Sequence, residues 1–314
     1  MNASASIHAA ASDFAASLGM TVEQCHVLDS RTPERTTTKC DLTGFGKRRT
    51  IVAKHYGDRS IRPVAEAMQY VQDGIDALKL KVLRIPRLLR VDKLHSVVIQ
   101  EFAAGVAFAA LPNSDDFLNA SYLAGEALAE LHSIPIWPGR VMTLRDDVRD
   151  LIRPEPSQIA KKFPRFAETL DQWNAFMQHA IFSHEFVPAV IHRDFHLRQC
   201  FVLGNTMEVI DWDDAVVGDP AFDVGYLISY LKSHMSDTFA EKAIHEFAKG
   251  YSVRGDTSVF SRVRIYRAFN LVRRSARRLR LRDANWESQV REMLTNLQAE
   301  LDIRGYFGFA PLDS

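Results

Sequence analysis

The stretch VIHRDFHLRQCFV, residues 190–202, joins two short apolar runs through a polar loop. His192 and Asp194 follow the end of the first run, and the second run begins after Gln199. A further apolar run over 207–211 ends in Asp211, and the Gly204–Asn205 pair before it predicts a hairpin turn. Because polar side chains at strand ends beside a hairpin can converge, we expect these residues to share one cleft.

Working outward, the first third of the chain reads as strands over 24–29, 35–43 and 49–56. A helix should follow from about residue 60, with Pro63 in its first turn and an end before Gly74. Two more strands fit 87–92 and 95–102. The pattern predicts an α+β fold with a β-rich lobe over 1–102 and a helical lobe over 103–314.

The helical part contains one unusual segment, since nine arginines fall among the 21 residues from Arg262 to Arg282. An apolar stripe at helical spacing runs through it and consists of Ile265, Ala268, Val272, Ala276 and Leu279. One interpretation is an amphipathic helix that closes the second lobe. The other is recognition of an anionic substrate or partner, and the sequence leaves both open.

Composition excludes several classes of protein. Lysine plus arginine and aspartate plus glutamate number 39 each, so the zero net charge argues against nucleic-acid or membrane-surface binding. The three cysteines lack a C-x-x-C pair, which argues against a disulfide framework or a zinc knuckle. The N-terminus resembles no secretory signal and no apolar stretch reaches membrane-span length, so we expect a cytoplasmic protein.

The residues around the polar loop suit phosphoryl transfer. That chemistry needs one carboxylate to accept the proton of the attacking group, and a carboxylate and an amide oxygen to hold metal ions. Asp194 suits the first role, and Asp211 and Gln199 suit the second. Lys54, on the third predicted strand, is the candidate for the phosphates of the nucleotide, and Glu66 on the following helix is its expected partner.

The ordered pattern resembles the aminoglycoside-phosphotransferase and choline-kinase-like family. It consists of His192-x-Asp194 with Gln199, then Ile210-Asp211-Trp212-Asp213, then Gly218-Asp219-Pro220-x-x-Asp223. The resemblance implies a two-lobed protein-kinase-like fold and a Mg²⁺- and ATP-dependent kinase that acts on a small molecule, with GTP left open as donor. It further implies that Gln100, Glu101 and Phe102 form the hinge that meets adenine, and that Asp223 braces the catalytic loop, which His192 also supports.

Two departures from the family pattern keep alternatives open. The family usually has Asn where this chain has Gln199, and residues 29–36 contain no glycine, so Ser30, Thr32 and Arg35 would have to help cover the phosphates. One alternative is therefore a catalytically silent nucleotide-binding module. A second alternative is independent of these departures and is a metal-dependent hydrolase, in which His192, Asp194 and His196 join Asp211 and Asp213 around a metal ion.

Overall fold

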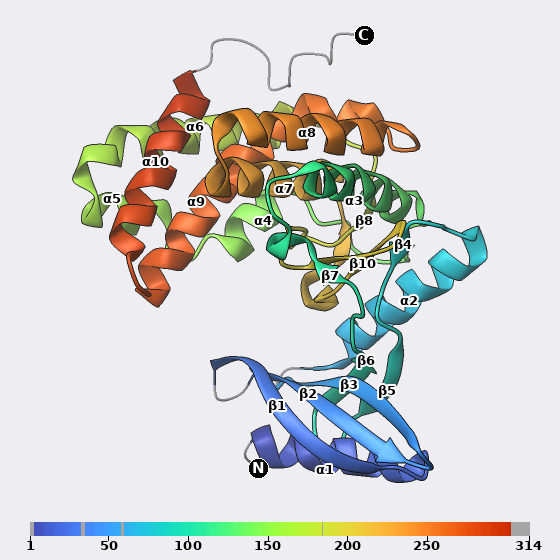
Figure 1. Cartoon of the computed structure of the whole chain (residues 1–314). Coiled ribbons are helices and arrows are strands. Elements are labelled where there is room, and N and C mark those ends of the chain that lie inside the picture. Colours follow the sequence, from blue (N-terminus) through green and yellow to red (C-terminus); the bar gives the residue numbers. More distant parts are fainter. Residues whose placement is uncertain (1–2, 33–34, 58–59, 184, 303–314) are drawn as a thin grey trace. The chain divides into compact units, whose positions relative to one another are not determined.

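The computed structural model describes residues 3–32, 35–57, 60–183 and 185–302. The chain divides into two compact units, the first comprising residues up to Val106 together with Phe201–Ala215. The second comprises Ala107–Cys200 and the residues from Val216 onward. The hairpin that the sequence places in the second lobe therefore groups with the first unit, whose strands are labelled in Figure 1.

An antiparallel sheet forms the centre of the first unit, in the order β1-β2-β3-β6-β5. Its strands are β1 (Thr21–Thr32), β2 (Arg35–Gly44), β3 (Lys47–His55), β5 (Leu88–Asp92) and β6 (Val97–Glu101). Alternate residues of β2 are buried, as expected for a strand with one face on a core. The five predicted strands are thus confirmed, although β1 is longer than expected at both ends.

One face of this sheet is covered by α1 (Ala3–Ser17), to which the sequence analysis assigned no element. Its buried side chains, Ile7, Ala10, Ala11, Phe14 and Ala15, recur at helical spacing and pack against the sheet core. Alanine has the highest helix propensity, and its small side chain lets the helix approach the sheet closely. The Ala/Ser-rich start therefore builds part of the core.

The predicted helix after β3 is α2 (Arg62–Leu78), and its predicted end before Gly74 is wrong. Pro63 lies in the first turn as expected, but the helix runs through Gly74 and ends at Lys79, whose φ is 51°. The cause is tertiary packing, because Ile75 lies beyond Gly74 and is buried on the same apolar face. That burial outweighs the cost of about 1 kcal/mol for a glycine inside a helix.

The predicted hairpin is present as β9 (Cys200–Leu203) and β10 (Thr206–Val209), and Gly204 has a φ of 57° in the turn. It lies in a small sheet of order β4-β10-β9-β7, completed by β4 (Leu83–Arg84) and β7 (Val106–Ala107). Residues 210–215 follow β10 directly, so the hairpin fixes where Asp211 leaves the sheet.

The cysteine pattern argues against a disulfide framework and does not reveal that two of the three cysteines pair. Cys25 and Cys40 lie directly opposite each other in the β1–β2 ladder and form a disulfide. The spacing rule misses them because they are 15 residues apart in sequence, and only the register of two long strands brings them together. Cys200 is free and buried.

Alkylation should detect this disulfide. Denatured without reductant, the protein should take up one alkyl group, on Cys200, and it should take up three after reduction, as mass spectrometry would show. Cys25→Ser should lower the free energy of unfolding under oxidising conditions by about 2–3 kcal/mol, as expected for a short closed loop. Three alkyl groups on freshly purified, unreduced protein would contradict the pairing.

The second unit is helical. Its helices are α3 (Asp115–Ser133), α4 (Leu144–Leu151), α5 (Pro156–Lys162), α6 (Ala167–Ser183), α7 (Ala221–His234), α8 (Asp237–Ser252), α9 (Val263–Leu281) and α10 (Trp286–Asp302). Helices α3 and α8 run side by side (Figure 1). Two glycines permit this, since a Cβ on Gly125 would lie 2.1 Å from the Phe247 carbonyl oxygen and one on Gly250 would lie 2.0 Å from that of Tyr122.

A two-stranded ladder inside this unit carries the polar loop. β8 (Ala189–Ile191) pairs antiparallel with β11 (Val216–Gly218), and β8 is fully buried. The loop from His192 therefore begins at a fixed point of the core, and α7 begins shortly after β11. Among the described residues, no helix is long and apolar enough to cross a membrane.

Candidate active site

The residues that the sequence singles out fall into two groups, one in each unit. The first unit holds Lys54, Glu66, Gln100, Glu101, Phe102 and Asp211, and the second holds His192, Asp194, Gln199 and Asp223. Within the first unit, Lys54 and Asp211 are in direct contact.

In the first unit, β3 and the hairpin bring Lys54 and Asp211 together. Lys54 is buried on β3, and its Nζ lies 2.7 Å from Asp211 Oδ1 and 3.4 Å from Asp213 Oδ1. Asp211 has a φ of 68°, a left-handed conformation that Asp adopts more readily than most residues. Burial alone would lower the pKa of Lys54, but the two aspartates outweigh it and raise that pKa, so the ammonium stays charged.

The expected pair between Lys54 and Glu66 is replaced. Glu66 accepts a hydrogen bond from Arg62 Nε at 2.6 Å, and its side chain is 61% exposed. The reason is local, because Arg62 lies four residues earlier on α2 and the two side chains share one helix face. Lys54 takes its counter-charges from the segment after the hairpin instead.

Asp213, whose role the sequence leaves open, is the centre of a charged cluster. It forms an ion pair with Arg35 and accepts a hydrogen bond from Tyr56 Oη at 2.7 Å, besides its contact with Lys54. Burial and then Asp213 raise the pKa of Tyr56 well above its usual value, so the phenol keeps its proton. The cluster holds both aspartates of the Asp211-x-Asp213 pair against β2 and β3.

The predicted hinge residues lie at the end of β6. Gln100 is buried opposite Val52 of β3, and the Glu101 backbone N–H donates to the Arg87 carbonyl at 3.0 Å. Phe102 is 39% exposed, and Lys39 Nζ lies 5.3 Å from the centre of its ring. An exposed ring at a strand end is available for a ligand, and the adenine contact stays a prediction.

In the second unit, Asp223 holds the polar loop in place. The backbone N–H groups of His192 and Arg193 donate to its two carboxylate oxygens at 2.7 Å each, and the Asp223 side chain is fully buried. His192 Nδ1 accepts the backbone N–H of Asp194 at 3.3 Å, and its supporting role in the loop stays a prediction. Two backbone donors on one carboxylate fix the direction in which Asp194 leaves the loop.

Sequence reasoning missed a second anchor of this loop, the buried pair of Arg193 and Asp147. Arg193 has a φ of 66°, and its guanidinium donates from Nε to Asp147 Oδ1 at 3.0 Å. Burial raises the pKa of Asp147 to about 6, against the opposing charge of Arg193. Arg193 lies inside the diagnostic stretch, but its partner is 46 residues away and no local signal identifies it.

Asp194 is buried, and its two carboxylate oxygens have different surroundings. Oδ2 accepts a hydrogen bond from Gln199 Nε2 at 3.4 Å and lies 3.7 Å from His196 Nε2. Oδ1 accepts no hydrogen bond from any described residue, and its nearest cation is Arg273, with Nη2 at 3.9 Å. A buried carboxylate oxygen without a donor is costly unless a ligand supplies one. Oδ1 therefore keeps an unused acceptor position inside the loop.

Arg273 comes from the arginine-rich helix α9, and the sequence did not connect it with Asp194. Its Nη1 donates to the Arg193 carbonyl at 3.2 Å, and its guanidinium lies 5.2 Å from the ring centre of Tyr226. The predicted apolar stripe of α9 is buried, which confirms the helix as a closing element of its unit. One arginine of that helix also fixes the backbone and the charge around Asp194.

The chemistry of the donor set suits a magnesium ion. Asp211 offers a carboxylate and Gln199 an amide, and hard oxygen atoms of this kind are what Mg²⁺ prefers. Among the described residues, no group of three or more His, Cys, Asp and Glu side chains could hold a metal ion. The five-residue cluster of the hydrolase alternative is therefore not assembled within either unit.

Comparison with known proteins identifies the family. The model of the phosphotransferase enzyme family matches residues 42–266, more than half of the 314 residues. The chain therefore belongs to this family, and the resemblance drawn from the motifs is confirmed. Comparison with curated proteins gave no match.

Solved structures confirm the protein-kinase-like fold. The chain is similar to amicoumacin kinase hAmiN in complex with AMP-PNP, Ca²⁺ and Ami, at 13% identity over 88% of this chain and 89% of that chain, with a TM-score of 0.63. It is similar to aminoglycoside phosphotransferase APH(4)-Ia, at 16% identity, 95% and 98% coverage and a TM-score of 0.62. The chain is also similar to choline kinase LicA from Streptococcus pneumoniae, at 13% identity over 89% of this chain and 93% of that chain, with a TM-score of 0.60.

Proposed function

We propose that this phosphotransferase moves the γ-phosphoryl group of Mg²⁺-ATP to a hydroxyl or amine of a small molecule. The observation that carries the proposal is the buried Asp194 Oδ1, which accepts no hydrogen bond from the described residues. A carboxylate held in this way by the loop is suited to accept the proton of an attacking group. The family supports phosphoryl transfer over the hydrolase alternative.

The proposed reaction uses Asp194 as the proton acceptor. As the acceptor oxygen or nitrogen forms its bond to the γ-phosphorus, the bond from that phosphorus to the β,γ-bridging oxygen breaks and ADP leaves. The proton of the acceptor passes to Asp194 Oδ1. Gln199 Nε2 holds the carboxylate through a hydrogen bond to Oδ2, and the positive charge of Arg273 stabilises it. Positioning and charge stabilisation supply most of the rate enhancement in such transfers.

The proposed nucleotide contacts belong to the first unit. Lys54 would bind the α- and β-phosphates, and Gln100, Glu101 and Phe102 would meet the base. Asp211, helped by Gln199, would hold Mg²⁺, which neutralises charge on the phosphate oxygens. Asp211 and Asp213 would orient Lys54, because Glu66 is bound to Arg62 in the structure. The nucleotide-bound relative hAmiN supports a nucleotide cofactor, while ATP rather than GTP is part of the proposal.

The proposed acceptors are those that the family resemblance implies, namely an aminoglycoside, a sugar, a choline-like amine or a similar metabolite. A cytoplasmic location, where Mg²⁺ and ATP are abundant, belongs to the same proposal. The silent-module alternative predicts nucleotide binding without transfer. Release of ADP in the presence of an acceptor, measured over a panel of hydroxyl and amine compounds, separates that alternative from the enzyme.

Asp211→Asn should remove Mg²⁺-dependent nucleotide binding. The amide keeps the size of the side chain but loses the charge that holds the metal ion, so affinity for Mg²⁺-ATP should fall about 100-fold or more. Thermal melting with and without Mg²⁺ and ATP checks this. At 100 times Kd a ligand adds about 2.7 kcal/mol to the free energy of unfolding, and the rise in melting temperature should disappear in the variant.

Asp214→Asn provides the matched control, since Asp214 lies three residues further along the same segment. The Asp214→Asn variant should keep the Mg²⁺-dependent rise in melting temperature. A normal Mg²⁺-dependent shift in the Asp211 variant would contradict the assignment of this residue. If no nucleotide shifts the melting temperature of the wild-type protein, the nucleotide site itself is refuted.

A further inference from the structure

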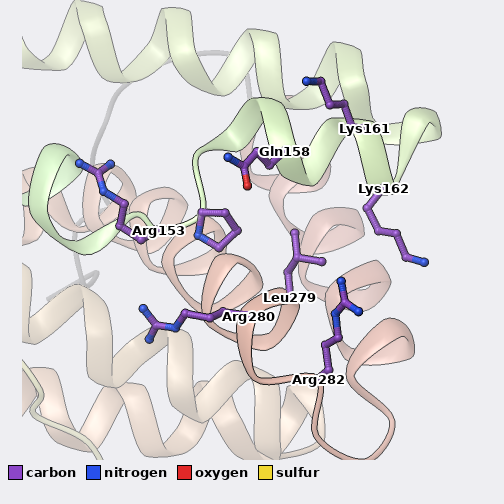
Figure 2. A pocket seen from close by; sticks show the side chains of 8 residues that line it. Arg153, Gln158, Lys161, Lys162, Leu279, Arg280 and Arg282 are labelled. Carbon is purple, nitrogen blue, oxygen red and sulfur yellow. The ribbon is translucent and has the colours of Figure 1, made fainter.

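A hollow of about 820 Å³ opens on the second unit, beside α5 and the end of α9 (Figure 2). It is separate from the residues assigned to phosphoryl transfer. Its lining consists of Arg153, Pro154, Gln158, Lys161, Lys162, Leu279, Arg280 and Arg282. Five of these eight side chains are cations and none is a carboxylate. A net positive hollow of this size is suited to an anionic ligand.

Helix ends explain only part of this charge. Lys161 and Lys162 end α5 and Arg280 lies in the last turn of α9, where a cation complements the partial negative charge of the terminal carbonyls. Arg153 lies between α4 and α5, however, and Arg282 lies beyond the end of α9. Two stretches of the chain, residues 153–162 and 280–282, thus bring cations to one hollow, which the dipole of a single helix does not require.

Nearby carboxylates neutralise little of the positive charge of the hollow. Arg153 lies 4.0 Å from Glu155, and Lys162 lies 3.3 Å from Glu287, both as exposed pairs that contribute little. Within the described part of the chain, no ion pair is formed by the other three cations, which are Lys161, Arg280 and Arg282. Their mutual repulsion raises the free energy of the empty hollow, and a bound anion would relieve it.

Aromatic packing holds two of the cations in place without neutralising them. The ring of Trp286 has Lys162 Nζ at 5.6 Å and the Arg282 guanidinium at 5.9 Å from its centre. A cation–π contact orients a cation and leaves its charge available. Phe163 packs edge-on against the same tryptophan at 6.0 Å, which anchors this wall of the hollow.

The middle of the hollow has a different character. Figure 2 shows Gln158 and Leu279 near the centre, with the charged side chains arranged around them, and Pro154 also lines the hollow. Gln158 offers an amide donor, and Pro154 and Leu279 offer apolar contact. A ligand with a compact body and charges at its periphery matches this distribution.

We propose that this hollow binds a small molecule that carries two or more phosphate groups. Arginine forks bind phosphate through two parallel hydrogen bonds, and lysines add point charges. A single phosphate would reach only part of a ring formed by three arginines and two lysines. The zero net charge of the chain disfavours a nucleic acid. The proposal does not depend on the transfer reaction.

The test is calorimetric titration of the full-length protein with tripolyphosphate, in buffer with EDTA so that a Mg²⁺-dependent nucleotide site contributes little. The double variant Lys161→Gln/Arg280→Gln removes two cations that make no ion pair. Each lost charge-assisted contact should weaken binding about tenfold, so Kd should rise about 100-fold. Arg277→Gln is the control, because Arg277 is exposed on the same α9 and does not line the hollow.

Equal Kd values for the wild-type protein and the double variant would overturn the proposal, as would loss of binding in Arg277→Gln to the same extent. Citrate separates phosphate recognition from general anion attraction, and citrate binding as tight as that of tripolyphosphate would also overturn it. Vesicles with and without a phosphoinositide distinguish the source of the phosphates. If the protein binds phosphoinositide vesicles more tightly than tripolyphosphate, and this binding requires Lys161 and Arg280, the phosphates belong to a lipid headgroup. Melting temperatures of all variants report whether each is folded.

Discussion

Asp194→Asn should lower turnover by about a thousandfold, within the range known for loss of a general base. The asparagine keeps the shape of the side chain, and Oδ1 in the native loop accepts no hydrogen bond from the described residues, so the loop should stay folded. What is lost is the ability to accept a proton, because an amide does not bind one near neutral pH. The affinity for Mg²⁺-ATP should change little, since the proposed nucleotide contacts involve other residues.

Turnover is measured by ADP release with the best acceptor of the panel, and nucleotide affinity by thermal melting. Asp171→Asn serves as the control, because Asp171 is an exposed residue of α6 and should leave both quantities unchanged. Turnover of the Asp194 variant within tenfold of the wild-type protein would refute its role as proton acceptor. Loss of nucleotide affinity in that variant would indicate that Asp194 acts through structure.

Features with a local cause could be predicted from the sequence. The hairpin with its Gly204–Asn205 turn, the strands of the first sheet and the buried stripe of α9 all follow from periodicity and turn chemistry. The ordered motif around Asp194 and Asp211 led to the family, which is confirmed. Each of these inferences depends on residues close together in the chain.

Features with a distant cause could not be predicted. Asp147 lies 46 residues from Arg193, and Arg273 lies 79 residues from Asp194, so only the packing of helices brings them to the loop. Glu66 shows the converse error, since a local neighbour, Arg62, took the place of the expected tertiary partner.

The disulfide and part of the core could not be predicted either. Cys25 and Cys40 meet through the register of β1 and β2, and a count of cysteines carries no information about register. The helix α1 was missed because most of the side chains on its buried face are alanines, which give a weaker apolar signal than larger side chains, although they fill the face of the sheet.

Asp223→Ala should cause the largest loss of stability. Asp223 accepts the backbone N–H groups of His192 and Arg193 at 2.7 Å each, and its side chain is fully buried. Alanine leaves both donors buried without an acceptor, at about 1–3 kcal/mol each, and removes a side chain from a packed site. The free energy of unfolding should therefore fall by about 4 kcal/mol, and the melting temperature by about 8–16 °C.

Asp223→Asn tests how much of this stability depends on the two hydrogen bonds. Its amide oxygen still accepts one of the two N–H groups, while its NH₂ group faces the other donor, so about one hydrogen bond remains. Its stability should lie between that of the wild-type protein and Asp223→Ala, and denaturant unfolding of the three proteins gives the order. Asp171→Ala, at an exposed position, should change the free energy of unfolding by less than about 0.5 kcal/mol. If Asp223→Ala were as stable as this control, the carboxylate would not be the anchor of the loop, and the orientation of Asp194 would need another cause.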